Sequence, residues 1–341
     1  PIFFGGVNVY LQQNVGLFRV IPMWSDRFLS HRRLLKGIGK RASSTSPSSL
    51  GPMTVSMLRG EKGNQRKEVK RLLRWIQKQE AFDVICLSNL LLAGLAEPLR
   101  ASTGARVVAT MQGEEGFLYA LPDPYKTQAI ELLSEACSAL DATIAVSANY
   151  GDRMASLLDL PEAMVSVVWN GIDTDPLSDT KRARESSHRP VLGYFARMCP
   201  EKGLKELVHA FLKLRSGDSV SEPLLRIGGT CTKLDEALIA ELKKEIHDAG
   251  LTKDVSWHPN LSDEEKRDFM SGLDIFCVPG PADESFGLYV IEAMASGLPV
   301  LAPNHAAFPE IVAKTGGGIL YDPSDSEGLV VALSELLTTP E

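Results

Sequence analysis

The sequence lacks a disulfide framework, a membrane-spanning run and a signal peptide. Its 341 residues include five cysteines, an odd number without a CxxC spacing, and most of them lie in apolar runs. Such thiols are typical of a reduced compartment, so we expect neither disulfides nor a zinc site. No apolar run reaches the roughly eighteen residues that a transmembrane helix needs. We therefore expect a cytoplasmic protein.

The composition is that of a globular chain with an uneven charge distribution. Apolar residues make up 44% and charged residues 23% of the chain, which is enough apolar surface for two ordinary domains. Residues 1–170 carry 19 Lys and Arg against 15 Asp and Glu, whereas residues 171–341 carry 17 against 28. We therefore expect the two halves to have different partners, and no nucleic acid among them.

Short apolar runs alternate with amphipathic helical patterns along most of the chain. In the second half six strand-helix units follow one another, and the first half repeats this pattern less regularly. Parallel neighbouring strands need crossover helices, so this order predicts doubly wound α/β domains. We predict two, at residues 1–175 and 176–341, with the boundary in the polar segment 173–190. We also expect a Ser/Pro-rich loop at residues 42–52.

The stretch ESFGLYVIE, residues 284–292, places two carboxylates eight residues apart around a Phe-Gly pair. A predicted strand ends just before it, and a helix is expected from Gly287 to Gly297. Ligands of doubly wound sheets bind where strand ends lead into helix N-termini, whose N–H groups suit phosphate. Glu284 and Glu292 are then placed to accept hydrogen bonds from hydroxyls at opposite ends of one ligand. The alternative is a solvated loop acid and a helix-surface acid.

Two basic residues follow another predicted strand, VLGYFA. Arg197 comes directly after this strand, and Lys202 lies five residues later beside Gly203, where a helix is expected to begin. A guanidinium and an ammonium at one strand end suit a diphosphate. The alternative is a surface pair that caps a helix, but the position at a strand-to-helix turn favours a ligand.

The segments ARMCPEKGLKEL and ESFGLYVIEAMASGLPVLA resemble the donor-binding half of the retaining family 4 glycosyltransferases (glycosyl transferases group 1), which have the GT-B architecture. The resemblance covers nearly the whole chain and is strongest over residues 190–323. It implies two Rossmann-like domains that face a cleft, with the first strand and the C-terminal crossover helix missing from this chain. It implies that Arg197 and Lys202 bind the diphosphate and that Glu284 binds hydroxyls of the transferred sugar, and these three residues form the implied catalytic set. It also implies contacts to the nucleotide sugar from the backbone of Phe286, Gly287 and Leu288, at the sugar and phosphate, and from Glu292, at the ribose.

Four further residues match the family with lower specificity. Gly229 lies where the family contacts the nucleotide, and His258 lies where members line the base pocket, although a His at a strand end is more often structural. Gly5 and Gly6 resemble the N-terminal glycine loop, where backbone N–H groups approach donor phosphate or acceptor. A helix-starting turn is the alternative for this glycine pair.

The acceptor side departs from the family pattern. Gln112 occupies the position where the family usually has a His near the reacting sugar, and a Gln cannot exchange a proton near neutral pH. Glu114 is a candidate for contact with the acceptor or sugar, with a solvated loop acid as the alternative. Ser147 resembles a family position that faces the cleft, and a helix N-cap explains it as well.

The resemblance implies the retaining transfer of a hexose from a nucleotide diphosphate sugar to a hydroxyl acceptor, saccharide or lipid-linked. It favours a UDP-sugar over a GDP-sugar and suggests polysaccharide or glycolipid synthesis. Positive groups at the leaving diphosphate make a metal or other cofactor unnecessary. Two other functions stay open. A GT-B nucleotide-sugar epimerase would need a protein base near the sugar, and a non-catalytic sugar-nucleotide binding subunit is favoured by Gln112 but opposed by the complete donor set.

Residues 16–42 mix aromatic and aliphatic side chains with seven cations and a single acid, Asp26. This composition suits an interfacial helix on the inner face of the cell membrane, near a lipid-linked acceptor. The favoured alternative is a pair of helices packed on the core of the first domain.

Overall fold

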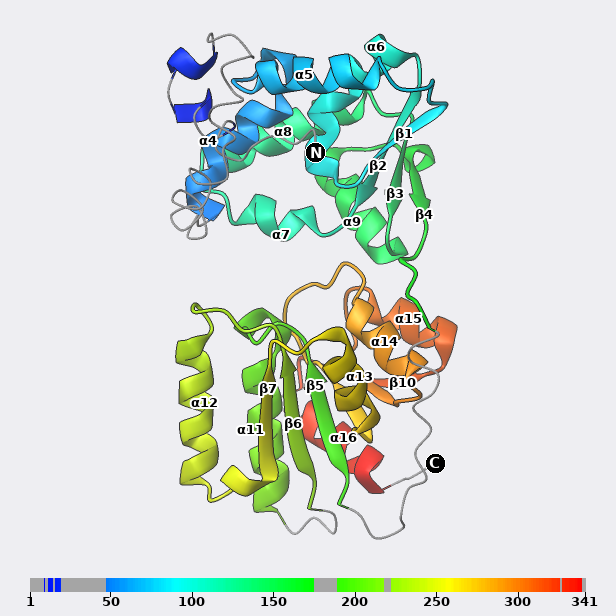
Figure 1. Cartoon of the computed structure of the whole chain (residues 1–341). Helices are drawn as coiled ribbons and strands as arrows, with labels where there is room; N and C mark the ends of the chain where they lie inside the picture. The colour runs from blue at the N-terminus through cyan, green and yellow to red at the C-terminus, as the bar shows by residue number, and fades with distance from the viewer. Residues whose placement is uncertain are drawn as a thin grey trace. The chain divides into compact units, whose positions relative to one another are not determined.

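The computed structural model describes residues 9, 12–14, 16–19, 47–174, 189–217, 222–325 and 327–338. The chain divides into two compact units, Pro1–Trp169 and Asn170–Glu341. Each unit is a parallel sheet with helices packed against it (Figure 1). The predicted glycine loop at Gly5 and Gly6, and most of the basic segment 16–42, lie outside the described residues.

The first unit contains a four-stranded parallel sheet in the order β1-β2-β3-β4. Its strand β2 buries every second side chain completely, as expected for the period of two along a strand. The strands are β1 (Val84–Leu87), β2 (Arg106–Met111), β3 (Ala142–Ala145) and β4 (Val165–Val167). The helices are α4 (Pro47–Leu58), α5 (Arg66–Ile76), α6 (Ala96–Thr103), α7 (Glu114–Tyr119), α8 (Tyr125–Cys137) and α9 (Ala148–Leu158), with short 3-10 turns at Gly16–Arg19, Gly60–Lys62, Leu90–Leu95 and Glu162–Met164.

The predicted Ser/Pro-rich loop at residues 42–52 is wrong in its second half, because α4 begins at Pro47. Proline is tolerated at the first helical position, where no intrahelical N–H bond is lost. Packing against α8 then stabilises a helix that composition alone disfavours. A Cβ at Gly51 would lie 2.7 Å from the side chain of Tyr125, so only a glycine lets the two helices approach this closely.

The second unit contains a six-stranded parallel sheet in the order β10-β9-β8-β5-β6-β7. The strands are β5 (Val191–Phe195), β6 (Leu224–Gly229), β7 (Val255–Pro259), β8 (Ile275–Cys277), β9 (Val300–Pro303) and β10 (Gly318–Tyr321). The helices are α11 (Leu204–Ser216), α12 (Glu236–Asp248), α13 (Asp263–Ser271), α14 (Leu288–Ala295), α15 (Phe308–Thr315) and α16 (Gly328–Thr338), with 3-10 turns at Pro200–Lys202 and Thr252–Asp254. The predicted succession of six strand-helix units is confirmed.

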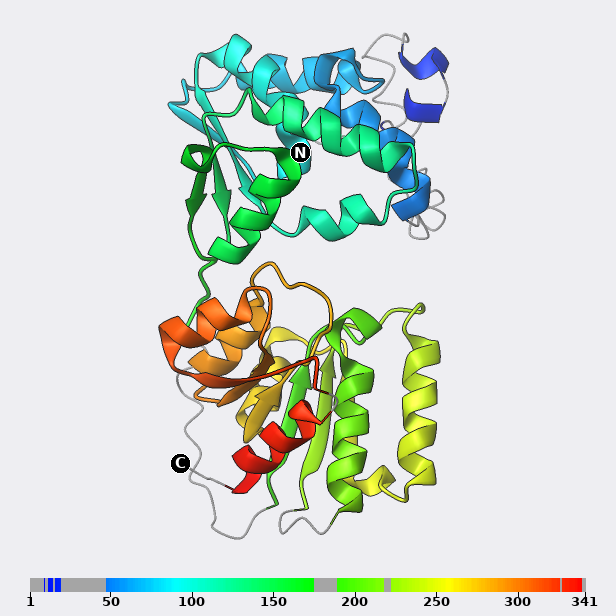
Figure 2. The same cartoon turned by 180° about the vertical axis from the view of Figure 1, so that it is seen from behind.

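The strand order of the second unit reverses beside β5. From β5 the chain moves outward through β6 to β7, then returns to β8 on the other side of β5. The two views agree that α11 and α16 cover one face of the sheet and α13 and α14 the other (Figure 1 and Figure 2). The unit is therefore doubly wound, and the junction of β5 and β8 is its topological switch point, where ligands of open α/β sheets bind.

Candidate functional site

The two motifs of the second unit lie at neighbouring strand ends. β5 and β8 pair in parallel, with Leu192 opposite Ile275 and Gly193 opposite Phe276. The segment with Arg197 and Lys202 leaves the carboxyl end of β5, and the segment with Glu284 leaves the carboxyl end of β8. Because these ends lie on the same edge of the sheet, the fold brings the two motifs together.

Lys202 and Glu284 form an ion pair between the two motifs. The Lys202 ammonium donates to Glu284 Oε2, and the Tyr289 hydroxyl donates to the same oxygen at 2.8 Å. The Lys202 Nζ also lies 5.1 Å from the centroid of the Tyr289 ring. The side chains of Lys202 and Glu284 are 28% and 15% exposed, so both stay within reach of a ligand. A cation and a carboxylate are thus in direct contact at the switch point of the sheet.

Two glycines let the motifs approach each other. A Cβ at Gly203, which has φ +71°, would lie 2.1 Å from the carbonyl oxygen of Pro279. A Cβ at Gly280 would lie 2.9 Å from the carbonyl oxygen of Glu201. The backbone after β5 is therefore packed directly on the loop after β8, and this contact fixes the position from which Lys202 reaches Glu284.

Arg197 contacts its own segment. Its Nε donates to the Cys199 Sγ at 3.1 Å, and its Nη2 donates to Glu201 Oε2 at 3.4 Å. The side chain of Arg197 is 55% exposed. The hydrogen bond to Cys199 is the main cause that raises the pKa of Arg197 above its ordinary value. The structure thus places a fixed, exposed guanidinium close in sequence to Lys202.

Glu292 pairs with a lysine that the sequence analysis did not single out. Its Oε1 accepts a hydrogen bond from Lys266 Nζ at 2.7 Å, which links α14 to α13. The same ammonium lies 5.2 Å from the centroid of the Phe195 ring, at the end of β5. Each predicted acid therefore has its own lysine.

Three further residues of this motif were predicted to contact the nucleotide sugar. Phe286 is buried in the core, Gly287 is the left-handed N-cap of α14, and Leu288 is exposed.

Gly229 and His258 lie at the next two strand ends. Gly229 ends β6 with φ +127°, and a Cβ there would lie 1.8 Å from the carbonyl oxygen of Ala196. His258 belongs to β7, and its ring packs edge-on against Phe269. Burial, followed by the charge of Arg226, lowers the pKa of His258 below its ordinary value. A hollow of 460 Å³ beside His258 is lined by Arg226, Ser256, Leu261, Glu265, Asp268 and Phe269.

In the first unit, Glu114 is a buried hydrogen-bond centre. It is 2% exposed and accepts hydrogen bonds from the backbone N–H groups of Leu90, Gln112 and Gly113 and from the Tyr150 hydroxyl. It is therefore no solvated loop acid, and its contacts favour a structural role over contact with an acceptor. The side chain of Gln112 is exposed just beyond β2.

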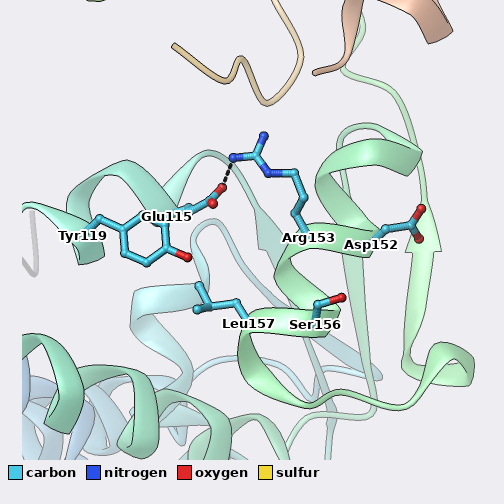
Figure 3. A pocket seen from close by; sticks show the side chains of 6 residues that line it. All are labelled: Glu115, Tyr119, Asp152, Arg153, Ser156 and Leu157. Atoms are coloured by element: carbon cyan, nitrogen blue, oxygen red, sulfur yellow. Dashed lines mark hydrogen bonds and ion pairs between the residues drawn. The ribbon is translucent and has the colours of Figure 1, made fainter. Parts of the chain in front are cut away.

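Ser147 is the N-cap of α9. Its hydroxyl accepts a hydrogen bond from the Tyr150 backbone N–H at 3.1 Å, and its side chain is fully buried. Beside α9 the first unit has an open hollow of 440 Å³ toward α7 (Figure 3). The Glu115 and Arg153 side chains point toward each other there as an ion pair, and Asp152 points away from them. Tyr119, Ser156 and Leu157 complete the lining.

Three contact residues of the second unit were missed by the sequence analysis. Tyr289 lies inside ESFGLYVIE, and an aromatic residue in the first turn after a ligand loop was a readable signal. Cys199 lies between the two predicted cations and was counted only among the five reduced thiols. Lys266 carried no such signal, because its partner is 26 residues away.

The described part of the chain contains neither a cluster of metal ligands nor a membrane-spanning helix. Among those residues no group of three or more His, Cys, Asp or Glu side chains is placed to hold a metal ion. No helix there combines the length and the apolar character needed to cross a bilayer.

The chain is similar to several mannosyltransferases. It is 32% identical over 200 residues to the MMP alpha-(1->4)-mannosyltransferase of Mycolicibacterium hassiacum, which covers 57% of this chain and 44% of the relative. It is 27% identical over 259 residues to the GDP-mannose-dependent alpha-(1-6)-phosphatidylinositol monomannoside mannosyltransferase of Mycobacterium tuberculosis, which covers 72% of this chain and 64% of the relative. The chain thus spans less than two thirds of the length of either protein.

Solved structures share the fold. A glycosyltransferase from Rickettsia africae matches with a TM-score of 0.63 and 17% identity, over 98% of this chain and 85% of that one. HepE of Anabaena, in complex with UDP, matches with a TM-score of 0.66 and 18% identity, over 82% and 74%. At these identities the likeness shows the fold alone, two Rossmann-like domains.

Two family descriptions cover most of the chain, one for each unit. Glycosyltransferase Family 4 matches residues 51–176, and Glycosyl transferases group 1 matches residues 178–341. The second match contains the Lys202–Glu284 pair and the Lys266–Glu292 pair. The chain belongs to the family 4 glycosyltransferases.

Proposed function

We propose that this chain transfers a hexose from a nucleotide diphosphate sugar to a hydroxyl acceptor with retention of configuration and without a metal ion. The observation that carries the proposal is the contact between Lys202 and Glu284. It brings a cation suited to phosphate and a carboxylate suited to sugar hydroxyls together at the switch point of the sheet. The names of the relatives make GDP-mannose a donor to test beside the UDP-hexoses that the sequence analysis favours. A saccharide or lipid-linked hydroxyl is the proposed acceptor.

The chemistry that the residues supply is charge stabilisation. When the bond between the sugar and the diphosphate breaks, negative charge develops on the leaving diphosphate, and Arg197 and Lys202 are the cations proposed to receive it. The acceptor hydroxyl attacks the same face of the sugar, and its proton passes to the departing diphosphate. Glu284 then needs only to bind sugar hydroxyls. This division of roles agrees with Gln112, which cannot serve as a proton-transferring base.

The proposal is tested by binding and turnover with a defined donor panel. UDP-glucose, UDP-galactose, UDP-N-acetylglucosamine and GDP-mannose are titrated by calorimetry, and nucleotide release is measured with and without simple glycoside acceptors. We expect one nucleotide sugar of the panel to bind. Lys202→Met should lower kcat by about a hundredfold, which is the cost of removing one hydrogen-bond donor to a developing anion. Glu284→Gln should also lower turnover.

Matched controls are available on the same unit. Lys205 and Glu241 form an exposed ion pair between α11 and α12, so Lys205→Met and Glu241→Gln remove the same charges from a pair that does not include Lys202 or Glu284. These controls should bind and turn over like the unchanged protein. If no donor of the panel binds, or if the control variants lose as much as the site variants, the proposed function is wrong.

The two alternative functions give different products. An epimerase would convert the sugar or release nucleotide without any acceptor, and mass spectrometry of the sugar detects that product. A non-catalytic subunit would bind the donor and release no nucleotide under any condition. The exposed Gln112 at the usual His position is the observation that keeps the second alternative in the test.

A further inference from the structure

Tyr289 contacts both members of the central ion pair. It is the second residue of α14, its hydroxyl donates to Glu284 Oε2 at 2.8 Å, and its ring centroid lies 5.1 Å from Lys202 Nζ. The ring also packs near Phe276 of β8, with 6.4 Å between the ring centroids. The side chain is thus anchored in the sheet and extends to the two polar groups of the candidate site.

The Tyr289 hydroxyl acts as a donor. Burial, followed by the negative charge of Glu284, raises the pKa of Tyr289 well above its ordinary value, so the hydroxyl keeps its proton. Hydrogen bonds from Tyr289 and Lys202 both end on Oε2 of Glu284. Within the described ranges, Oε1 of Glu284 accepts no hydrogen bond from the protein, and the side chain is partly exposed. One oxygen is therefore held, and the other is left to accept.

Two roles can be separated on this one side chain. The hydroxyl holds the orientation of the Glu284 carboxylate, and the ring face attracts the Lys202 ammonium by a cation–π interaction. An anion that draws the ammonium away from Glu284 would remove one of the two donors on Oε2. The hydrogen bond from Tyr289 would remain, and it would keep the carboxylate in place.

We propose that Tyr289 is a positioning residue of the donor site, which holds Glu284 oriented toward sugar hydroxyls while Lys202 engages the diphosphate. The inference rests on the proposed function for the identity of the ligand. The contacts among Tyr289, Lys202 and Glu284 do not depend on it. A packing role alone would explain the half-buried ring but gives no use for a hydroxyl that donates to the carboxylate paired with Lys202.

The variant Tyr289→Phe keeps the ring and removes the hydroxyl. In titrations with UDP, GDP and the donor found above, we expect an affinity for the free nucleoside diphosphate within about twofold of the unchanged protein. We expect kcat to fall by about tenfold to a hundredfold, the range for loss of one hydrogen bond to a charged group.

Tyr289→Leu and Tyr321→Phe complete the set. The leucine variant also loses the ring face, so it should weaken the nucleoside diphosphate affinity as well. Tyr321 is a buried tyrosine of β10, and its variant removes a hydroxyl elsewhere in the same unit. We expect it to leave kcat and KM unchanged.

Carboxyl NMR at one fixed pH without nucleotide tests the positioning role independently of the activity. With ¹³C-labelled glutamate, the carboxyl chemical shift of Glu284 should change in Tyr289→Phe, which loses the hydrogen bond to Oε2, and stay constant in Tyr321→Phe. If the Glu284 chemical shift and the kinetics of Tyr289→Phe both equal those of the unchanged protein, the inference is overturned. If the Glu284 chemical shift changes but the unchanged protein binds no nucleotide, the proposed function fails while the contact between Tyr289 and Glu284 stands.

Discussion

The Lys266 ammonium lies 2.7 Å from Glu292 Oε1 and thereby joins α13 to α14 across the edge of the sheet where β5 ends. The two side chains are 23% and 25% exposed, so solvent screens the pair only in part. Together with Lys202 and Glu284, this pair gives the candidate site two lysine–glutamate contacts. Each of these carboxylates is paired with a lysine. A ligand hydroxyl that donates a hydrogen bond to Glu284 or Glu292 therefore binds a carboxylate that also accepts one from an ammonium group.

We expect Glu292→Gln to change nucleotide affinity more than stability. A partly exposed ion pair contributes about 0.2–1 kcal/mol to folding, so a double-mutant cycle with Lys266→Met should give a coupling energy in that range in urea unfolding. The affinity for UDP or GDP should fall about tenfold, because a hydrogen bond from the ribose to a charged acceptor is lost. A nucleotide affinity that Glu292→Gln leaves unchanged would remove the ribose assignment.

Gly203→Ala should destabilise the second unit and move Lys202. The substitution places a Cβ against the carbonyl oxygen of Pro279 and forces a non-glycine residue to keep φ +71°. Gly250 is a matched control, because it has φ +73° and nothing lies within 4 Å of its Cβ position. Gly250→Ala should cost only the left-handed penalty of about 1–2 kcal/mol.

The free energy of unfolding of the Gly203→Ala variant should therefore fall by more than that of Gly250→Ala. Urea denaturation of both variants measures the difference. Equal losses would show that the backbone after β5 relaxes around the added methyl group without cost. In that case the close approach to Pro279 would not fix the position of Lys202.

Cys199→Val should weaken diphosphate binding, whereas Cys199→Ser should preserve it. The Cys199 sulfur accepts the Arg197 Nε at 3.1 Å, and burial raises the pKa of this thiol above its ordinary value, so it stays protonated. A serine hydroxyl still accepts from the guanidinium, but a valine leaves it without this anchor. Calorimetry with UDP and GDP should show an affinity lower by about threefold to tenfold for valine, the effect of a net 0.5–1.5 kcal/mol hydrogen bond. Equal affinities for the two variants would contradict this role.

The stability of the protein should decrease as the pH is lowered, and His258 should contribute to this decrease. Its pKa is lowered in the folded protein, by burial first and by the charge of Arg226 second, from an ordinary value of 6.5. The neutral ring therefore favours the folded state above pH 6.5, and this contribution is lost as the pH falls through the lowered pKa, because the unfolded chain binds the proton more readily. Thermal melts from pH 8 to pH 5 should show a smaller loss of Tm for His258→Gln. An identical loss would assign the pH dependence to other groups.

Glu114→Ala should destabilise the first unit strongly. The carboxylate accepts three backbone N–H groups and the Tyr150 hydroxyl, and each buried donor left without a partner costs about 1–3 kcal/mol. Tyr150→Phe removes one bond to Glu114 and an acceptor of the Gly113 and Glu115 N–H groups, and it should cost less than Glu114→Ala because Gly113 keeps its bond to Glu114. The comparison is made by urea unfolding. A Glu114→Ala variant as stable as the unchanged protein would mean that Glu114 is available for a ligand after all.

The sequence predicted the frame of the second unit well, and the reason is local. Alternating apolar runs and amphipathic patterns report the period of each element, and crossover connections then restrict the sheet to parallel strands. The positions of Lys202 and Glu284 just past strand ends followed from the same pattern, but their direct ion pair was not predicted. The Ser/Pro-rich composition before residue 52 misled, since packing on α8 outweighs the weak local preference against α4.

Contacts that depend on packing between distant segments were beyond such patterns. No spacing rule connects Lys266 with Glu292, because α13 and α14 meet only after the sheet has formed. The hydrogen bonds of Glu114 also come from three separate segments, so a buried acid looked like a loop acid. Tyr289 lies inside the motif that the sequence analysis identified. Whether its side chain only packs or also positions Glu284 could be decided only from the location of Glu284.

The strand order of the second unit also has a consequence for synthesis on the ribosome. β5 emerges early, but its neighbour β8 follows only after β6, β7 and the helices between them. Until then one edge of β5 has unpaired N–H and C=O groups, and such edges pair readily with other chains. Chains interrupted before residue 275 therefore retain an open strand in the middle of the future sheet, where it is most prone to aggregate.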